Sequence, residues 1–262
     1  MSWLLVTGVA LVIGIFVVLF LTRGDDTGRG KASAGAIDKL TSVPVSTLET
    51  VGVPPQPSNV HVLPPGTPPI EQDGKPVVLY IGAEYCPFCA LERWPMVVAL
   101  SRFGTFSGLE STTSAPPPET LPNTPTVTFA GSSYTSDYIT FSSAETQTRD
   151  FSPLETLTPT QQQLIDTYDV ESITGSNGAI PFVMIGNLYA WAGSQFEPST
   201  LDGLTFDQIA SQLSDPATDV AKQIGGAANY ITAMICQLTD GQPSDVCSSA
   251  VIQQAQAALP TS

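Results

Sequence analysis

The sequence is poor in basic residues and contains a single histidine. Nine of its 262 residues are Lys or Arg, against 24 Asp or Glu, and the formal net charge is -15 at pH 7. No basic cluster follows the first few dozen positions, so a Lys/Arg surface for nucleic acid is excluded. His61 lies in a proline-rich stretch, and the sequence has neither a glycine-rich phosphate loop nor a hydrolase elbow. Neither Ser–His chemistry nor nucleotide chemistry is therefore indicated.

One long uncharged run is present, at the N-terminus. Trp3 to Leu21 contains 19 residues without a charged side chain, enough to cross the hydrocarbon core of a bilayer as a helix. A cleaved signal peptide is the alternative. Its apolar stretch is usually only about 7–15 residues long, and the sequence Ala32-Ser33-Ala34 lies well beyond the run, behind charged residues. We therefore predict an uncleaved transmembrane helix as an anchor over residues 1–22.

Two opposing signals bear on the orientation of this anchor. Arg23, Arg29 and Lys31 follow the span, and the positive-inside rule taken alone puts them in the cytoplasm. The cysteine usage described below is typical of an oxidising compartment. We predict a single-pass protein of the cell membrane whose main domain lies on the extracytoplasmic side.

Residues 23–75 are predicted to form a tether and a proline-rich linker. Gly, Ser, Ala and charged residues dominate its beginning, and residues 37–50 favour a short helix interrupted by Pro44. Seven prolines between 53 and 69 forbid a regular helix and favour an extended chain. The main domain is predicted over residues 76–262.

Hydrophobic patterning within this domain predicts an α/β fold. Strands are predicted at 76–82, 126–129, 138–141, 180–186 and 188–192, and helices at 90–103, 160–168, 205–213, 219–238 and 248–259. The first and fourth strands are apolar and β-branched, as expected of strands buried on both faces. The second and third are expected to pair across Gly131-Ser132-Ser133, and the last two across Asn187. We predict a mixed sheet of about four or five strands flanked by helices, with a helical C-terminal extension.

Two cysteines separated by two residues follow the first predicted strand, in the sequence Cys86-Pro87-Phe88-Cys89. At the N-terminus of a helix they meet unpaired backbone N–H groups and a positive field, and both favour a thiolate. Cys86, the more exposed of the two, would attack a substrate disulfide, and Cys89, one turn inside the helix, would resolve the mixed disulfide. Pro87 pre-sets the backbone for the first helical turn.

The same cysteine spacing occurs in zinc sites. The strand–turn–helix context favours the redox interpretation, and no second close pair of Cys or His is present. Cys236 and Cys247 are separated by ten residues that include Gly241 and Pro243, which allow the chain to turn. We predict a structural disulfide between them; two buried free thiols are the alternative.

The segment Leu79 to Cys89 (LYIGAEYCPFC) resembles the active-site segment of thioredoxin-superfamily proteins. Together with Glu92-Arg93-Trp94 and the sequence ALSRFG at 99–104, it resembles a prokaryotic family of membrane-anchored, thioredoxin-like proteins of uncharacterised function. This resemblance runs from about Ile37 to the end of the chain. It implies a thioredoxin-like fold and a redox role for the cysteine pair.

The resemblance also implies a substrate groove. In thioredoxin-like folds a cis-proline at the start of a strand faces the two cysteines, and Pro181, after Ile180, holds that place here. A trans proline entering an edge strand is the alternative. The groove residues implied around the cysteines are Tyr85, Pro87, Phe88 and Ile180.

The sequence departs from the strongest oxidants of this superfamily. Phe88 stands where they often carry a histidine between the cysteines, and Tyr85 stands where thioredoxins carry tryptophan. Phe88 adds no charge, and Glu84 and Glu92 would oppose a thiolate if they pointed inward. We therefore expect a less oxidising centre. The charged neighbours Glu84, Glu92 and Arg93 are expected at the surface; a buried carboxylate that assists proton transfer from Cys89 is the alternative. The aromatic residues Trp94, Trp191 and Tyr189 are expected in the core, with a peptide groove as the alternative.

These observations predict a membrane-anchored thiol–disulfide oxidoreductase in which Cys86, Cys89 and Pro181 form the catalytic centre. No metal or organic cofactor is implied. The expected partners are protein thiols or disulfides, a redox protein that recycles the cysteine pair and the membrane, and nucleic acid is not among them. Two other classes stay open: a binding or assembly module without catalysis, and a metal-binding chaperone that uses Cys86 and Cys89.

Overall fold

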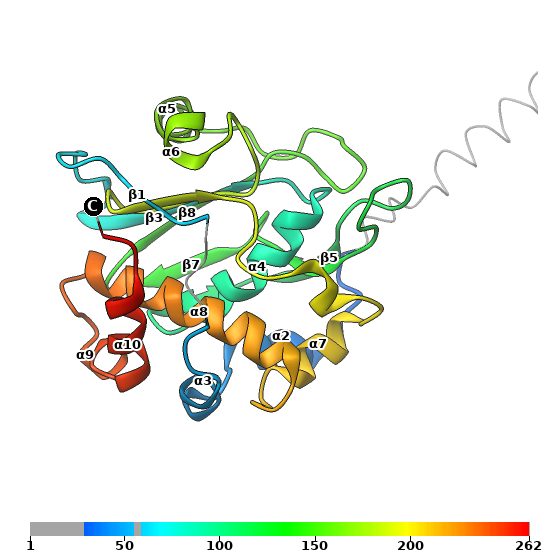
Figure 1. Cartoon of the computed structure of the whole chain (residues 1–262). Coiled ribbons are helices and arrows are strands. Elements are labelled where there is room, and N and C mark those ends of the chain that lie inside the picture. The colour runs from blue at the N-terminus through cyan, green and yellow to red at the C-terminus, as the bar shows by residue number, and fades with distance from the viewer. Residues whose placement is uncertain (1–28, 55–58, 262) are drawn as a thin grey trace, which may run out of the picture.

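The protein is a mixed α/β structure with helices on both faces of one sheet (Figure 1). This computed structural model describes residues 29–54 and 59–261, so the predicted anchor over residues 1–22 lies outside the described residues. Within them, no helix is both long and apolar enough to cross a bilayer. The predicted fold class, a mixed sheet flanked by helices, is confirmed.

The central sheet is arranged around one buried strand. In the described chain its members are β1 (His61–Val62), β2 (Glu71–Gln72), β3 (Lys75–Gly82), β8 (Thr140–Glu145), β9 (Phe182–Ile185) and β10 (Tyr189–Ala192). β3 runs parallel to β8 and antiparallel to β9, and β10 and then β1 continue the sheet beyond β9. β2 pairs with the first two residues of β3. The predicted β9–β10 hairpin is confirmed.

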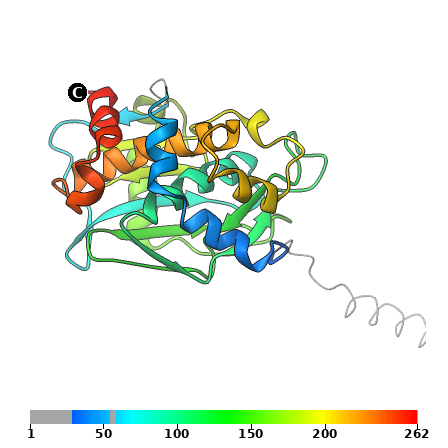
Figure 2. The same ribbon diagram turned by 90° about the horizontal axis from the view of Figure 1, so that it is seen from below.

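The helices form layers on the two faces of this sheet. Their bounds are α2 (Ala34–Thr41), α3 (Val45–Val51), α4 (Pro87–Leu100), α5 (Pro159–Tyr168), α6 (Glu171–Thr174), η1 (Pro198–Leu201), α7 (Phe206–Gln212), α8 (Asp219–Leu238), α9 (Ser244–Cys247) and α10 (Ala250–Ala258). In Figure 1, α5 and α6 lie on one face of the sheet and α4 and α8 on the other. Figure 2 shows α2, α3 and α10 on the outer side of α4 and α8.

Side chains of β3 supply both hydrophobic cores. Val77, Leu79 and Ile81 point to the face covered by α5, where they pack with Leu164. Val78 and Tyr80 point to the opposite face and join the larger core around α4 and α8. A strand buried on both faces has a continuous apolar sequence, which is the pattern that marked this strand.

The strand pair predicted between 126–129 and 138–141 is wrong. Four short strands follow α4: β4 (Gly104–Ser107), β5 (Glu110–Thr113), β6 (Pro125–Thr128) and β7 (Ser133–Ser136). β6 pairs with β5 and β7 pairs with β4, whereas β8 enters the central sheet beside β3. The alternation of polar and apolar residues located the strands, but alternation does not specify a partner when several short strands compete.

Residues 34–54, which precede the predicted domain boundary, pack against the domain. Pro44 separates α2 from α3, as predicted. Leu40 and Leu48 are buried in the core around α8, and the Asn229 side chain donates hydrogen bonds to the carbonyls of Leu48 and Gly52, each at 2.8 Å. This segment therefore contributes to the core before the chain reaches β3.

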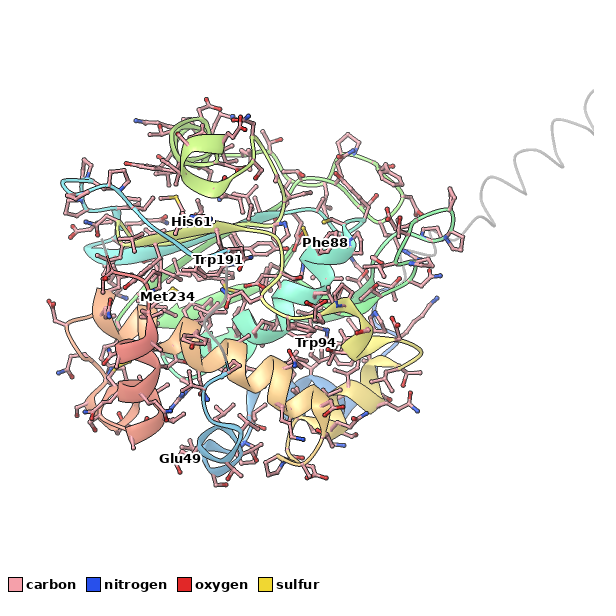
Figure 3. The ribbon with its side chains drawn as sticks, in the orientation of Figure 1. Glu49, His61, Phe88, Trp94, Trp191 and Met234 are labelled. Carbon is pink, nitrogen blue, oxygen red and sulfur yellow. A yellow bond between two sulfur atoms is a disulfide. The ribbon has the colours of Figure 1, made fainter. Side chains whose placement is uncertain are left out.

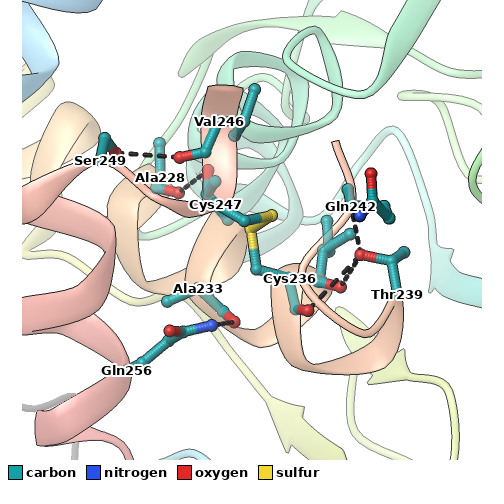
Figure 4. The surroundings of a disulfide bond; sticks show 11 residues. Ala228, Ala233, Cys236, Thr239, Gln242, Val246, Cys247, Ser249 and Gln256 are labelled. Carbon is teal, nitrogen blue, oxygen red and sulfur yellow. Dashed lines mark hydrogen bonds between the residues drawn. A yellow bond between two sulfur atoms is a disulfide. The ribbon is translucent and has the colours of Figure 1, made fainter. Parts of the chain in front are cut away.

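A disulfide joins Cys236 at the end of α8 to Cys247 at the end of α9 (Figure 4), which confirms the predicted pairing. It closes a loop whose ends are 11 positions apart, and such a crosslink restricts the unfolded chain. We expect the double substitution Cys236→Ser, Cys247→Ser to lower the free energy of unfolding by about 2–4 kcal/mol. Denaturant unfolding measures this change.

Reducing the wild-type disulfide without mutation is the matched control for that experiment. It should reproduce the loss seen in the double variant, because both treatments remove the same constraint. Equal stability of the oxidised wild type and the double variant would show that the crosslink adds nothing to this end of α8.

Candidate active site

The two cysteines lie at the beginning of α4, directly after β3. Cys86 is the N-cap residue, and its Sγ accepts a hydrogen bond from the backbone N–H of Cys89 at 3.3 Å. Pro87 is the first helical residue, a position whose N–H has no partner within the helix, so the N–H that proline lacks is not needed there. The helix thus begins at residue 87 rather than at the predicted residue 90, because this cap and this proline start it within the cysteine motif itself.

Burial and hydrogen bonding make the two thiols different. Cys86 retains 6% of its surface and Cys89 none. The hydrogen bond from the Cys89 side chain, aided by backbone N–H groups and by the charge of Arg93, holds the pKa of Cys86 below its ordinary value against the effect of burial. Burial first, and then the hydrogen bond to Cys86, raise the pKa of Cys89 well above its ordinary value. Cys86 is therefore the better nucleophile at neutral pH.

The structure brings Ile180 and Pro181 to the cysteines from a distant part of the sequence. The peptide bond between them is cis, and the Ile180 carbonyl accepts a hydrogen bond from the Cys86 thiol, with 3.5 Å between Sγ and the oxygen. Pro181 immediately precedes β9, the antiparallel neighbour of β3. The residues chosen from sequence as the catalytic centre thus form one cluster.

Aromatic side chains flank Cys86. Phe88 is 45% exposed and borders a cavity of about 500 Å³, which is also lined by Asn59, Gln195 and Glu197. Figure 3 shows Phe88 at the N-terminal end of α4. The ring of Tyr85 packs on that of Phe151, with 4.6 Å between their centroids. The sequence did not predict that Phe151 belongs to this site. The one available signal was a large aromatic residue in an otherwise polar loop.

The prediction that Glu84, Glu92 and Arg93 lie at the surface is wrong. All three are at least 99% buried. Arg93 forms a bidentate ion pair with Glu145 at the end of β8, with distances of 2.7 Å from Nε to Oε1 and from Nη2 to Oε2. Glu84 accepts hydrogen bonds from Nε and Nη2 of Arg29, at 2.9 and 2.6 Å. The physical reason is that Glu92 and Arg93 lie on α4, where every residue except Phe88 is buried, and that Glu84 is buried in the turn before it, so these charged side chains need partners.

One positive charge, that of Arg93, acts on both thiols. The principal influences on the pKa of Cys86 and Cys89 include neither Glu84, which is paired with Arg29, nor Glu92, whose carboxyl group accepts hydrogen bonds from Trp191 and Gln195. Arg93 lowers both pKa values. The guanidinium of Arg93 therefore supplies a cation that Phe88, between the cysteines, does not.

Glu92 carries a buried carboxyl group that has no cationic partner within residues 29–54 and 59–261. Its Oε1 accepts from the indole N–H of Trp191 at 3.2 Å, and its Oε2 accepts from the backbone N–H of Gln195 at 3.0 Å. Burial raises its pKa to about 8, although these two hydrogen bonds act in the opposite direction. Glu92 therefore links α4 to the segment after β10 that lines the cavity beside Phe88.

This raised pKa predicts a pH-dependent contribution to stability. The folded protein holds a proton on Glu92 at pH values where the unfolded chain, with a carboxyl pKa of about 4.3, has released it. The contribution of Glu92 to the free energy of unfolding is fully present below the carboxyl pKa of the unfolded chain, and it is lost as the pH rises toward 8. We expect the free energy of unfolding of the wild type to fall by at least about 1 kcal/mol relative to Glu92→Gln between pH 5 and pH 8.

Denaturant unfolding at each pH measures this difference. The amide of the glutamine variant has one hydrogen-bond acceptor fewer than the carboxyl group, and this lowers the variant's free energy of unfolding by the same amount at every pH. The informative quantity is therefore the change of the free energy of unfolding with pH. Glu49→Gln is the control, because Glu49 is exposed on α3 (Figure 3). Parallel pH profiles for the wild type and Glu92→Gln would contradict the assignment.

Other residue types considered from the sequence do not join this site. His61 lies on β1, away from Phe88 (Figure 3). Cys236 and Cys247 are bonded to each other and so do not complete a four-cysteine metal site with Cys86 and Cys89. Across residues 29–54 and 59–261, no group of three or more His, Cys, Asp or Glu side chains is arranged to hold a metal ion.

Fold and site together define a mixed α/β protein that presents a paired-cysteine motif at the N-terminus of a buried helix. A family model described as a domain of unknown function (DUF929) matches residues 67–237. This range covers roughly two thirds of the chain and includes both Cys86 and Cys89, so the chain belongs to the DUF929 family. Comparison with curated proteins and with solved structures gave no match.

Proposed function

We propose that this protein is a thioredoxin-like thiol–disulfide oxidoreductase that acts on protein thiols and disulfides. The observation that carries the proposal is the unequal pair of thiols at the start of α4. One sulfur accepts the N–H of the first helical turn and has a lowered pKa, and the other is fully buried with a raised pKa. This is the division of roles that thiol–disulfide exchange requires.

The sheet supports the thioredoxin-like assignment. In the order β8-β3-β9-β10, β8 is parallel to β3, and β9 and β10 follow antiparallel. The cysteines follow β3, and Ile180-Pro181 precedes β9, as the resemblance to thioredoxin-superfamily proteins implies. On this interpretation β4 to β7 are an insertion between α4 and β8, and α9 and α10 are a C-terminal extension.

The proposed reaction proceeds in two exchanges. The Cys86 thiolate attacks one sulfur of a substrate disulfide, forming a bond between Cys86 and that sulfur and releasing the other sulfur as a thiolate. Cys89 then attacks Sγ of Cys86, which releases the second substrate sulfur and leaves a Cys86–Cys89 disulfide. The substrate gains two electrons and two protons that the cysteine pair loses. A separate dithiol protein would restore the pair, and the reverse sequence would oxidise a substrate.

The substrate chain would contact the groove residues Tyr85, Pro87, Phe88 and Ile180. The carbonyl of Ile180 already meets the Cys86 thiol, and the ring of Phe151, packed on Tyr85, would extend the groove. We further propose, from the residue 3–21 run and the Cys236–Cys247 disulfide, that the domain works at the extracytoplasmic face of the cell membrane. Disulfides persist in such a compartment, where substrates of this chemistry are found.

Reduction of insulin by dithiothreitol tests the activity. The full chain, kept in mild detergent because of its apolar run at residues 3–21, is added in catalytic amounts. The proposal predicts that insulin chains separate and precipitate faster than with dithiothreitol alone. An unchanged rate, with the protein folded and Cys86 reduced, would contradict it.

A binding or assembly module without catalysis is the second candidate, and one observation favours it. Only 6% of the surface of Cys86 is exposed. A substrate sulfur can therefore reach it only in a restricted direction, unless the residues around Cys86 move apart. Alkylation of folded protein with iodoacetamide discriminates the two. Rapid modification at Cys86 supports exchange, whereas modification only after unfolding supports the binding module.

A further inference from the structure

A buried arginine lies behind the two cysteines. Arg93 follows Cys89 by four residues on α4, so the two side chains share one face of the helix, and both are fully buried. Helical side chains lean toward the helix N-terminus. Arg93 Nη2 accordingly donates to the Ala83 carbonyl at 2.8 Å, and the same carbonyl accepts the backbone N–H of Cys86 at 3.2 Å. The guanidinium group therefore lies against the turn that carries both sulfurs.

Glu145 fixes this guanidinium group but leaves part of it unused. The carboxylate binds Nε and Nη2 in a two-point geometry that a lysine could not reproduce. The remaining nitrogen, Nη1, and the hydroxyl of Tyr80 are both buried, and neither has a hydrogen-bond partner among the residues that the structure describes. Buried donors without partners are rare in folded proteins and need an explanation. Here the unused donor belongs to a cation placed one helical turn from Cys89.

Stability alone does not account for this ion pair. Replacing a buried pair by apolar residues of similar size is often neutral or stabilising, because desolvation offsets the attraction between the charges. Arg93 lowers the pKa of Cys89 more than Glu145 raises it, so the pair has a net electrostatic effect at the buried sulfur. That effect favours the thiolate which the resolving step needs.

We propose that Arg93 assists the resolving step: Nη1 donates to the Cys89 sulfur as it becomes a thiolate and attacks Cys86, while Glu145 positions the guanidinium group. This inference rests on the proposed oxidoreductase function. In the step, the Cys89 S–H bond breaks, the Cys86–Cys89 bond forms and the bond from Cys86 to the substrate breaks. The electron pair of that bond leaves on the substrate sulfur, which takes up a proton in place of the one that Cys89 releases. Arg93 keeps its proton throughout.

An aromatic disulfide, dithiobis(nitrobenzoate), separates the two exchanges. The first coloured nitrothiobenzoate is released when Cys86 attacks the reagent, and the second when Cys89 resolves the adduct. The reduced full chain is mixed with the reagent in a stopped-flow instrument, and both rates are followed against pH. The ionisable and charged groups that interact with the buried sulfur are Cys86, Arg93, Tyr80, Tyr85 and Glu145.

The test variant is Arg93→Met with Glu145→Met, which removes both charges and leaves neither uncompensated. We expect the midpoint pH of the second release to rise by about one unit, which slows that release about tenfold at pH 7. The first release should slow less, because a hydrogen bond from Cys89 is the main influence on Cys86. Arg93→Lys keeps the positive charge and should return the midpoint toward the wild-type value. Arg102→Met, at the far end of α4, is the control for loss of a partly buried arginine.

The outcomes separate the two proposals. A folded Met/Met variant with the wild-type rate and midpoint for the second release would overturn the role of Arg93. If that variant does not fold, Arg93→Gln with Glu145→Gln, which keeps a neutral hydrogen-bonded pair, is judged by the same criterion. If the folded wild type releases no nitrothiobenzoate, or releases only the first, the proposed oxidoreductase function fails before Arg93 is tested.

Discussion

Replacing Cys86 by serine is expected to lower the protein-catalysed rate of insulin reduction, the part above the rate with dithiothreitol alone, by at least about a thousandfold, as removal of a catalytic nucleophile does in other enzymes. The serine hydroxyl is not ionised at neutral pH, so the helix N-terminus and Arg93 would have no anion to stabilise. Cys89 cannot substitute for it, because Cys89 is fully buried and its pKa is raised. The initial rate of insulin precipitation gives the measurement.

Cys89→Ser should fail differently. Cys86 can still attack a substrate, but no thiol resolves the adduct, so mixed disulfides between Cys86 and substrate accumulate. Non-reducing gels followed by mass spectrometry detect them. The matched control is Cys236→Ser with Cys247→Ser, which should keep activity at a temperature where it is folded. Equal trapping by Cys86→Ser and Cys89→Ser would contradict the assigned roles.

The single substitution Arg93→Met is expected to have the largest effect on stability, lowering the free energy of unfolding by about 3–5 kcal/mol. Arg93 and Glu145 are both fully buried, and Glu145 accepts both of its strong hydrogen bonds from this side chain. Removing the cation leaves a carboxyl group in the protein interior, which must remain charged without a partner or take up a proton. Denaturant unfolding at pH 7 measures the loss.

An exposed ion pair on α8 gives the control for this prediction. Lys222 lies 3.6 Å from Asp219, and both side chains are at least half exposed. Lys222→Met should therefore change stability by less than about 1 kcal/mol. Adding Glu145→Met to Arg93→Met should restore most of the lost stability, since the orphaned carboxyl group is then gone. If the double variant were no more stable than the single one, lost packing rather than lost charge would be the cause.

The sequence predicts the parts of this fold that have a strong and local signal. β3 and β9 are continuous apolar runs, and α8 has a long helical pattern. The positions of the cysteines follow from the order of strand, turn and helix. Each of these signals lies within a few residues of the feature that it predicts.

Pairing across long distances was not predictable in the same way. The strands between α4 and β8 are four residues long and rich in Ser and Thr, so no continuous apolar face fixes their partners. Arg93 and Glu145 are 52 residues apart, and a single sequence gives no sign that they meet. One local signal was available: α4 is apolar on every side, and a charged residue in such a helix needs a buried partner.

The site therefore combines a predictable motif with surroundings that only the fold reveals. The sequence identified Cys86, Cys89, Ile180 and Pro181, and the structure places them together. It did not identify the cation behind the thiols or the hydrogen bonds of Glu92 to the neighbouring segment. Of these unpredicted contacts, those of Arg93 are expected to influence how readily each thiol reacts.

Redox equilibrium of the full chain in glutathione buffers tests the central claim most directly. After each equilibration a mass-tagged maleimide labels the free thiols, and mass spectrometry reports the four cysteines separately. The account predicts reversible two-electron oxidation of Cys86 and Cys89, while Cys236 and Cys247 stay bonded throughout. A pair that remains reduced in every buffer, or that is oxidised only by joining another molecule of the protein, would contradict it.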